Sequence, residues 1–332
     1  MAVEGLTLDR FDAAGLICGY ELLPDAPPRR LAAPPGPRES PQRPVWLHLN
    51  LSDNRARRWL ADCPDLGEPA QELLLGDDAH IRVSADRQRV FGVLGDLHHD
   101  FDNDPDKLGT LLFYADERRL ITGRRHPLQA VDRLRHDVDA AREPIGGPFT
   151  LLARLVDRLA DTFDAVNRDL AEAVDAAEDR VLKDRPEGVG GALANVRRVL
   201  ARLRRHGQAN RQALGRALAA LPAAAGDAAE DARAAVGRFE AVGHDLELVQ
   251  DRARLLQEEI ARLLNESTNR NLYVLSIVTA LMLPVTLITG VFGMNVGGLP
   301  WVEQAAGFWW VMLLMLATLG GTLLLLLWKR FF

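Results

Sequence analysis

The chain has 332 residues and a formal net charge of −6, with 40 Lys and Arg residues against 46 Asp and Glu residues. This balance argues against a nucleic-acid-binding protein, because such proteins usually carry a strongly basic surface. No phosphate-binding loop, nucleophile elbow or dinucleotide fingerprint is present, so we predict neither an enzyme nor a permanently bound cofactor. The acidic N-terminus lacks an apolar run and does not resemble a signal peptide.

Residues 1–145 are predicted to form an α+β domain in the cytoplasm. Short apolar runs rich in β-branched and aromatic residues indicate strands at 16–23, 45–49, 81–83, 90–94, 111–114 and 119–122. Helical patterns occur at 54–60 and 128–142, and the proline-rich stretch 24–44 is predicted to be a loop.

Residues 146–270 are predicted to form long stalk helices. Apolar residues recur at steps of three and four from Phe149, and a second helix is expected at 193–221. A third helix begins near Asp227 and has a heptad-like apolar seam over 239–263. The seam is compatible with pairing between subunits and equally with burial inside one subunit. This helix continues without a stop signal into the last domain, 271–332.

Two uncharged segments, 272–292 and 307–328, are each long enough to span a membrane as a helix. Arg270 precedes the first span, whereas Lys329 and Arg330 follow the second. The connecting loop has no Lys or Arg and one acid, Glu303. The positive-inside rule therefore predicts a transmembrane hairpin with both termini in the cytoplasm.

Polar and small residues form a stripe along the first span. Ser276, Thr279, Thr286 and Gly290 share it with Leu283, and Asn269 extends it. Such a stripe suits either close packing between helices or the wall of a pore. Two helices cannot enclose a pore, so a conducting hairpin requires a homo-oligomer, most simply a closed ring. Asn295 and Glu303 would then form rings at the outer mouth that attract cations.

The end of the first span resembles the CorA superfamily of divalent-cation transporters. The resemblance is carried by Leu283-Pro284-Val285-Thr286, by Gly293-Met294-Asn295 and by the order of the domains. It implies a funnel-shaped homopentamer in the bacterial inner membrane. In this assembly Asn295 would meet the hydrated ion, Gly293 would permit close backbone approach and Met294 would brace the loop. The resemblance also implies that Thr286, Leu283, Thr279, Leu275 and Asn269 line the pore.

The sequence Asn295-Val296-Gly297-Gly298-Leu299-Pro300 is more similar to the ZntB zinc-transporter branch than to the magnesium branch. The resemblance therefore favours zinc as the transported cation, with uptake coupled to protons. A magnesium or cobalt channel of the same architecture is the nearest alternative. A signalling or scaffold protein that uses the hairpin only as an anchor is the alternative from another class.

A second cluster of ligand-type side chains lies in the first domain. His98, His99, Asp100 and Asp102 combine imidazole and carboxylate groups, which suit zinc. Their spacing matches no known metal-binding loop. The sequence is therefore compatible with a solvated acidic loop and with a cytoplasmic metal-sensing site.

Overall fold

The computed structural model describes residues 15–102, 104, 107–183, 188–221, 225–294, 297–301 and 306–328. They fall into two compact units that meet in the chain between Gln257 and Glu258. The strands are β1 (Leu16–Glu21), β2 (Arg29–Arg30), β3 (Val45–Asn50), β4 (Arg82–Ala85), β5 (Val90–Leu97), β6 (Leu108–Ala115) and β7 (Arg119–Arg124). The helices are α1 (Asn54–Ala61), the short 3-10 helix η1 (Pro64–Leu66), α2 (Glu68–Leu75), α3 (Gln129–Ala140), α4 (Pro148–Leu182), α5 (Val189–Leu218), α6 (Ala228–Phe292) and α7 (Gly307–Trp328).

The first unit is built on one seven-stranded sheet with the order β2-β1-β3-β7-β6-β5-β4. Neighbouring strands are antiparallel except β3 and β7, which pair in parallel. The six predicted strands are present at their expected places. The prediction of a loop for 24–44 needs one correction, because Arg29 and Arg30 pair with β1 as the edge strand β2.

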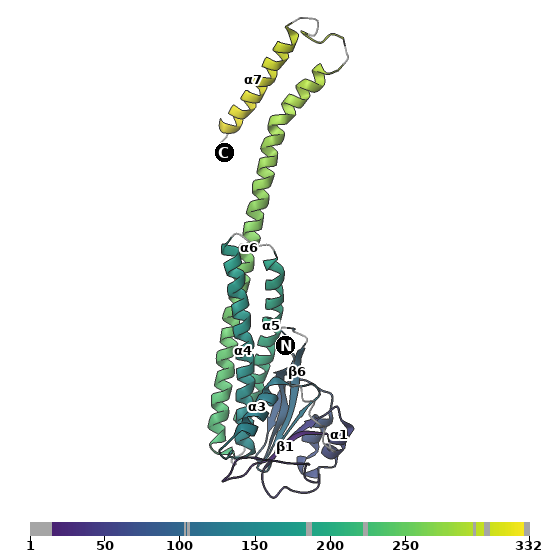
Figure 1. Cartoon of the computed structure of the whole chain (residues 1–332), viewed down its shortest axis with the longest axis vertical. Coiled ribbons are helices and arrows are strands. Elements are labelled where there is room, and N and C mark those ends of the chain that lie inside the picture. The colour runs from purple at the N-terminus through teal and green to yellow at the C-terminus, as the bar shows by residue number, and fades with distance from the viewer. Residues whose placement is uncertain are drawn as a thin grey trace, which may run out of the picture. The chain divides into compact units, whose positions relative to one another are not determined.

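Helices cover both faces of this sheet (Figure 1). Alternation along β3 turns Leu47 and Leu49 toward α1 and α2, where Trp59 and Leu74 complete an apolar core. The opposite face carries Trp46, which stacks on Tyr20 with ring centroids 5.4 Å apart. The Tyr20 hydroxyl donates to Asp139 of α3 at 2.7 Å and so ties this face to its covering helix.

Helix α5 is joined to the sheet by the side chain of Asn210. Its amide oxygen accepts from the backbone N–H of Gly95 at 2.8 Å, and its amide nitrogen donates to the carbonyl of Gly95 at 2.9 Å. Strand β4 pairs with β5 only as far as Val93, so it does not reach Gly95. The buried Asn210 side chain therefore satisfies backbone groups that the neighbouring strand leaves open.

Helices α4 and α5 and the part of α6 up to Gln257 form a bundle in the first unit. Phe239 of α6 packs edge-to-face on Phe163 of α4, with ring centroids 5.7 Å apart. Arg204 of α5 pairs with Glu247 of α6 at 2.7 Å. The seam residues buried in this part of α6 are Phe239, Val242, Leu246, Val249 and Ala253. The seam thus serves packing within one subunit, the second of the two arrangements that the sequence permits.

The second unit contains the rest of α6 and all of α7. Both helices have an 18-residue window whose mean hydropathy exceeds 2, and none of either window is buried in the single chain. A core helix of a soluble protein would be mostly buried, so these are candidate membrane spans. Their positions agree with the predicted spans 272–292 and 307–328. The division of the chain at 145 and 270 remains a prediction, because the bundle and the sheet lie in the same compact unit.

Candidate functional site

The polar stripe of the first span lies on a continuous helix, and its hydroxyl groups share one arrangement. Ser276, Thr279 and Thr286 each donate to the carbonyl four residues earlier, at 2.8, 2.8 and 2.9 Å. A hydroxyl has one hydrogen to donate and two lone pairs that accept. Because the hydrogen is used inside the helix, each oxygen offers only lone pairs to its surroundings. A row of such oxygens suits a cation or its water shell.

An open groove follows this stripe on the surface of α6. It is lined by Val278, Thr279, Met282, Leu283, Thr286, Leu287, Gly290, Val291 and Met294. Four of the predicted pore residues, Thr279, Leu283, Thr286 and Met294, therefore share one surface. Leu275 and Asn269 are also exposed on α6, but they do not line the groove.

Pro284 lies inside α6 between the two threonines of the groove. Proline has no backbone N–H, so the carbonyl of Ala280 loses its partner in the helix. This adds one more oxygen acceptor to the same span. In the sequence Pro284 is part of the family resemblance, and its missing backbone donor is in addition a chemical feature of the span.

The groove reaches Met294, just beyond Phe292, the last residue of α6. The N–H of Gly293 donates to the carbonyl of Thr289 at 2.9 Å, and the N–H of Met294 donates to that of Val291 at 3.3 Å. A Cβ atom at Gly293 would lie 2.8 Å from the Thr289 oxygen, so glycine is the residue that this turn accepts. Asn295 and Glu303, predicted for the outer mouth, lie outside the described residues.

Three aromatic rings link the end of α6 to the first turn of α7. Trp301 of the loop stacks on Phe292 at the end of α6 and on Trp310 of α7, with centroids 6.5 Å apart in both pairs. Trp301 has a positive φ of 64°, and its carbonyl lies where a Cβ of Gly307 would be. This stack is not among the contacts predicted from the sequence. Its only sequence signal is aromatic content on both sides of the Gly-Gly-Leu-Pro segment.

The side chains of the predicted metal cluster in the first unit pair with different residues outside the cluster. Asp100 pairs with Lys107 at 2.8 Å, and His99 Nδ1 lies 3.5 Å from Asp132. Within the described ranges, no three His, Cys, Asp or Glu side chains are placed so that they could hold one metal ion. His98, His99, Asp100 and Asp102 are thus not gathered into one site.

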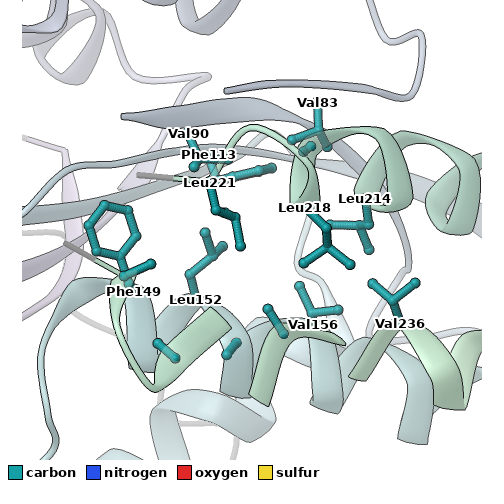
Figure 2. Close-up of a pocket in the computed structure, with 15 residues that line it drawn as sticks. Val83, Val90, Phe113, Phe149, Leu152, Val156, Leu214, Leu218, Leu221 and Val236 are labelled. Carbon is teal, nitrogen blue, oxygen red and sulfur yellow. The ribbon is translucent and has the colours of Figure 1, made fainter. Parts of the chain in front are cut away.

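An apolar cavity lies between the sheet and the helices of the first unit (Figure 2). Phe113 of β6, Phe149 and Leu152 of α4, and Leu214 of α5 are among its walls. Its space for water-sized molecules is only about 40 Å³, and its lining is almost wholly apolar. Such a space offers no ligands to a cation, so the groove on α6 remains the candidate site.

The fold and the groove together define a class of protein: an α/β unit with a helical bundle joined to a two-span hairpin that presents oxygen atoms along its first span. Comparison with known proteins gives the family. The sequence model of the family described as "CorA-like Mg2+ transporter protein" matches residues 41–330. The chain belongs to this CorA family of divalent-cation transporters, and it is a transporter rather than an enzyme.

The similar proteins agree with this assignment. The divalent cation transporter CmaX of Pseudomonas aeruginosa is 32% identical over 277 residues, which cover 81% of this chain and 82% of CmaX. The structure of full-length CmaX matches with a TM-score of 0.78 and 29% identity over 96% of this chain and 98% of that one.

Two more distant structures share the fold. The CorA magnesium transporter of Methanocaldococcus jannaschii has a TM-score of 0.70 at 19% identity, covering 94% of this chain and 97% of its own. The ZntB cytoplasmic domain of Vibrio parahaemolyticus has a TM-score of 0.66 at 15% identity, covering 76% and 99%. The CorA-like fold predicted from the sequence is therefore confirmed.

Proposed function

We propose that several copies of this chain form a closed ring in the bacterial inner membrane and pass a divalent cation along the groove of α6. The main support for this proposal is the groove, because the hydroxyl oxygens of Thr279 and Thr286, whose hydrogens are bonded within the helix, lie along a groove that reaches Met294. A single copy of α6 lines one side of a path. The copies of α6 from the other subunits, related by rotation about the ring axis, line the other sides. A pentamer is the ring implied by the family resemblance.

We propose zinc as the preferred cargo, taken up with protons, on the strength of the loop Asn295-Val296-Gly297-Gly298-Leu299-Pro300. Oxygen ligands alone suit magnesium at least as well as zinc, so the groove does not decide between them. The basic residues that flank the spans support a hairpin with both termini in the cytoplasm. In this orientation Asn295 and Glu303 face the outside.

The path is tested by replacing one hydroxyl in the purified chain and measuring flux in proteoliposomes. Thr286→Val keeps the shape of the side chain but removes the oxygen, and we expect about tenfold lower flux from the loss of one polar contact. Thr318→Val is the matched control, because Thr318 makes the same hydrogen bond to Leu314 at 2.7 Å but lies on α7. If the two variants show equal flux, the groove is not part of the cation path.

The cargo is tested in the same vesicles with zinc and magnesium, each with and without an inward proton gradient. We expect zinc uptake that rises with the inward proton gradient. Magnesium flux that follows the membrane potential and ignores pH would instead support the channel alternative. If neither ion moves through the wild-type chain, zinc and magnesium are both excluded as the cargo, and our proposal of zinc is wrong.

A further inference from the structure

Two histidines from separate segments meet on the surface of the first unit. His98 directly follows β5, and His126 lies between β7 and α3. Their ring centroids are 5.0 Å apart and their planes are inclined by 36°. Two imidazoles on one tetrahedral zinc ion, with Zn–N bonds of about 2.0–2.1 Å, have centroids roughly 5 Å apart. The two rings are therefore spaced as a shared metal ion requires.

The backbone holds the two segments together on both sides of the pair. The N–H of His99 donates to the carbonyl of Pro127 at 2.9 Å, and the side chain of Gln129 donates to the carbonyl of His98 at 3.1 Å. His98 and Leu128 also form an isolated β-bridge. Residues adjacent to each histidine are thus fixed before any ligand arrives, which lowers the entropy lost on binding.

The imidazole ring of His98 packs against backbone that carries no side chain. It lies against Gly109 of β6, where a Cβ atom would come within 2.7 Å of the imidazole Cδ2 and 2.8 Å of Nε2. The bare glycine therefore makes room for the ring. Partial burial, followed by the charge of His126, lowers the pKa of His98 and favours the neutral imidazole that binds metals.

We propose that His98 and His126 form a two-imidazole site for a transition-metal dication of the zinc, cobalt or nickel kind, with water in the remaining positions. Imidazole nitrogen suits these ions, whereas magnesium prefers oxygen. His126 is exposed, so the site is open to an ion and to water. This site lies in the first unit and is separate from the groove of α6. A bound ion would link the end of β5 to the segment that enters α3.

The test is equilibrium dialysis of the full chain in detergent against zinc and against magnesium. We expect His98→Ala and His126→Ala each to lose one zinc ion per chain, or to bind it more than about tenfold more weakly. The control is His80→Ala, because His80 is an exposed histidine of the same unit that pairs with Asp78. Magnesium binding should be the same in all of these chains.

The double variant distinguishes a shared ion from two independent ones. If both histidines hold the same ion, His98→Ala combined with His126→Ala loses no more zinc than either single change. Zinc should also raise the unfolding temperature of the wild-type and His80→Ala chains by more than that of the other variants, which keep only the groove. Equal zinc binding in all chains, or a loss in only one of the two single variants, would overturn the proposal.

Discussion

Gly293 is the residue whose local geometry most directly constrains the end of the first span. A Cβ atom there would lie 2.8 Å from the Thr289 carbonyl oxygen, a backbone atom that cannot move independently of the helix. We expect Gly293→Ala to displace the last turn and lower cation flux by more than about tenfold, because a displacement of about 1 Å in a functional site has effects of this size.

Gly320→Ala is the matched control for this change, because Gly320 lies in the second span, α7, outside the groove and the loop. Among the described residues beyond its own helix backbone, no atom lies within 4 Å of the position that a Cβ atom of Gly320 would take. Gly320 also has no positive φ that would strain an alanine. Flux in proteoliposomes and the amount of folded protein are measured for both variants. If Gly293→Ala conducts as well as Gly320→Ala does, the requirement for glycine at the helix end is wrong.

At the scale of elements, the attachment of α5 to the sheet depends on Asn210. Asn210→Leu would leave the buried N–H and carbonyl of Gly95 without partners, at a cost of about 1–3 kcal/mol for each group. We expect a clear fall in the thermal unfolding temperature of the detergent-solubilised chain. Gln208→Leu, on the same helix but only half-buried, should change it little. Equal unfolding temperatures for the two variants would contradict this role of Asn210.

Local periodicity predicted most of these elements, because it records which face of each segment is buried. The steps of three and four residues predict α4, α5 and α6, and alternation with turn residues predicts six strands. The contact between Asn210 and Gly95 joins residues 115 positions apart, and no local pattern encodes it. The pairing of β2 and the meeting of His98 with His126 depend on the folded chain in the same way.

The candidate site was predictable to a similar extent. The hydroxyl stripe and the glycine at the helix end are visible in the sequence, because helical spacing alone brings Thr279, Leu283 and Thr286 to one surface. Spacing alone does not show that the hydroxyl hydrogens are bonded within the helix. It also does not show that Trp301 stacks between the two spans, since that contact depends on how the loop turns back.

At the scale of the whole molecule, the proposed ring needs a surface on which subunits meet. In the bundle, α6 buries its seam inside the subunit but leaves Leu248 and Leu255 52% and 59% exposed. These two leucines are seven residues apart, so they lie on the same side of the helix. Exposed large apolar side chains that share one side of a helix are typical of an interface. We therefore expect this side of α6 to be covered by a second copy of the chain.

Placing charge on this surface should separate the subunits. Burial of a leucine contributes about 1.5–3 kcal/mol, and a buried unpaired carboxylate adds a further penalty, so Leu248→Glu with Leu255→Glu should shift the assembly toward single chains. The mass of the detergent-solubilised complex, measured by light scattering or native mass spectrometry, reports the change. Leu182→Glu is the control, because Leu182 is 79% exposed but lies at the end of α4. An unchanged mass in the double variant would show that the ring is held together by other surfaces, since two carboxylates per subunit could not remain in an apolar contact.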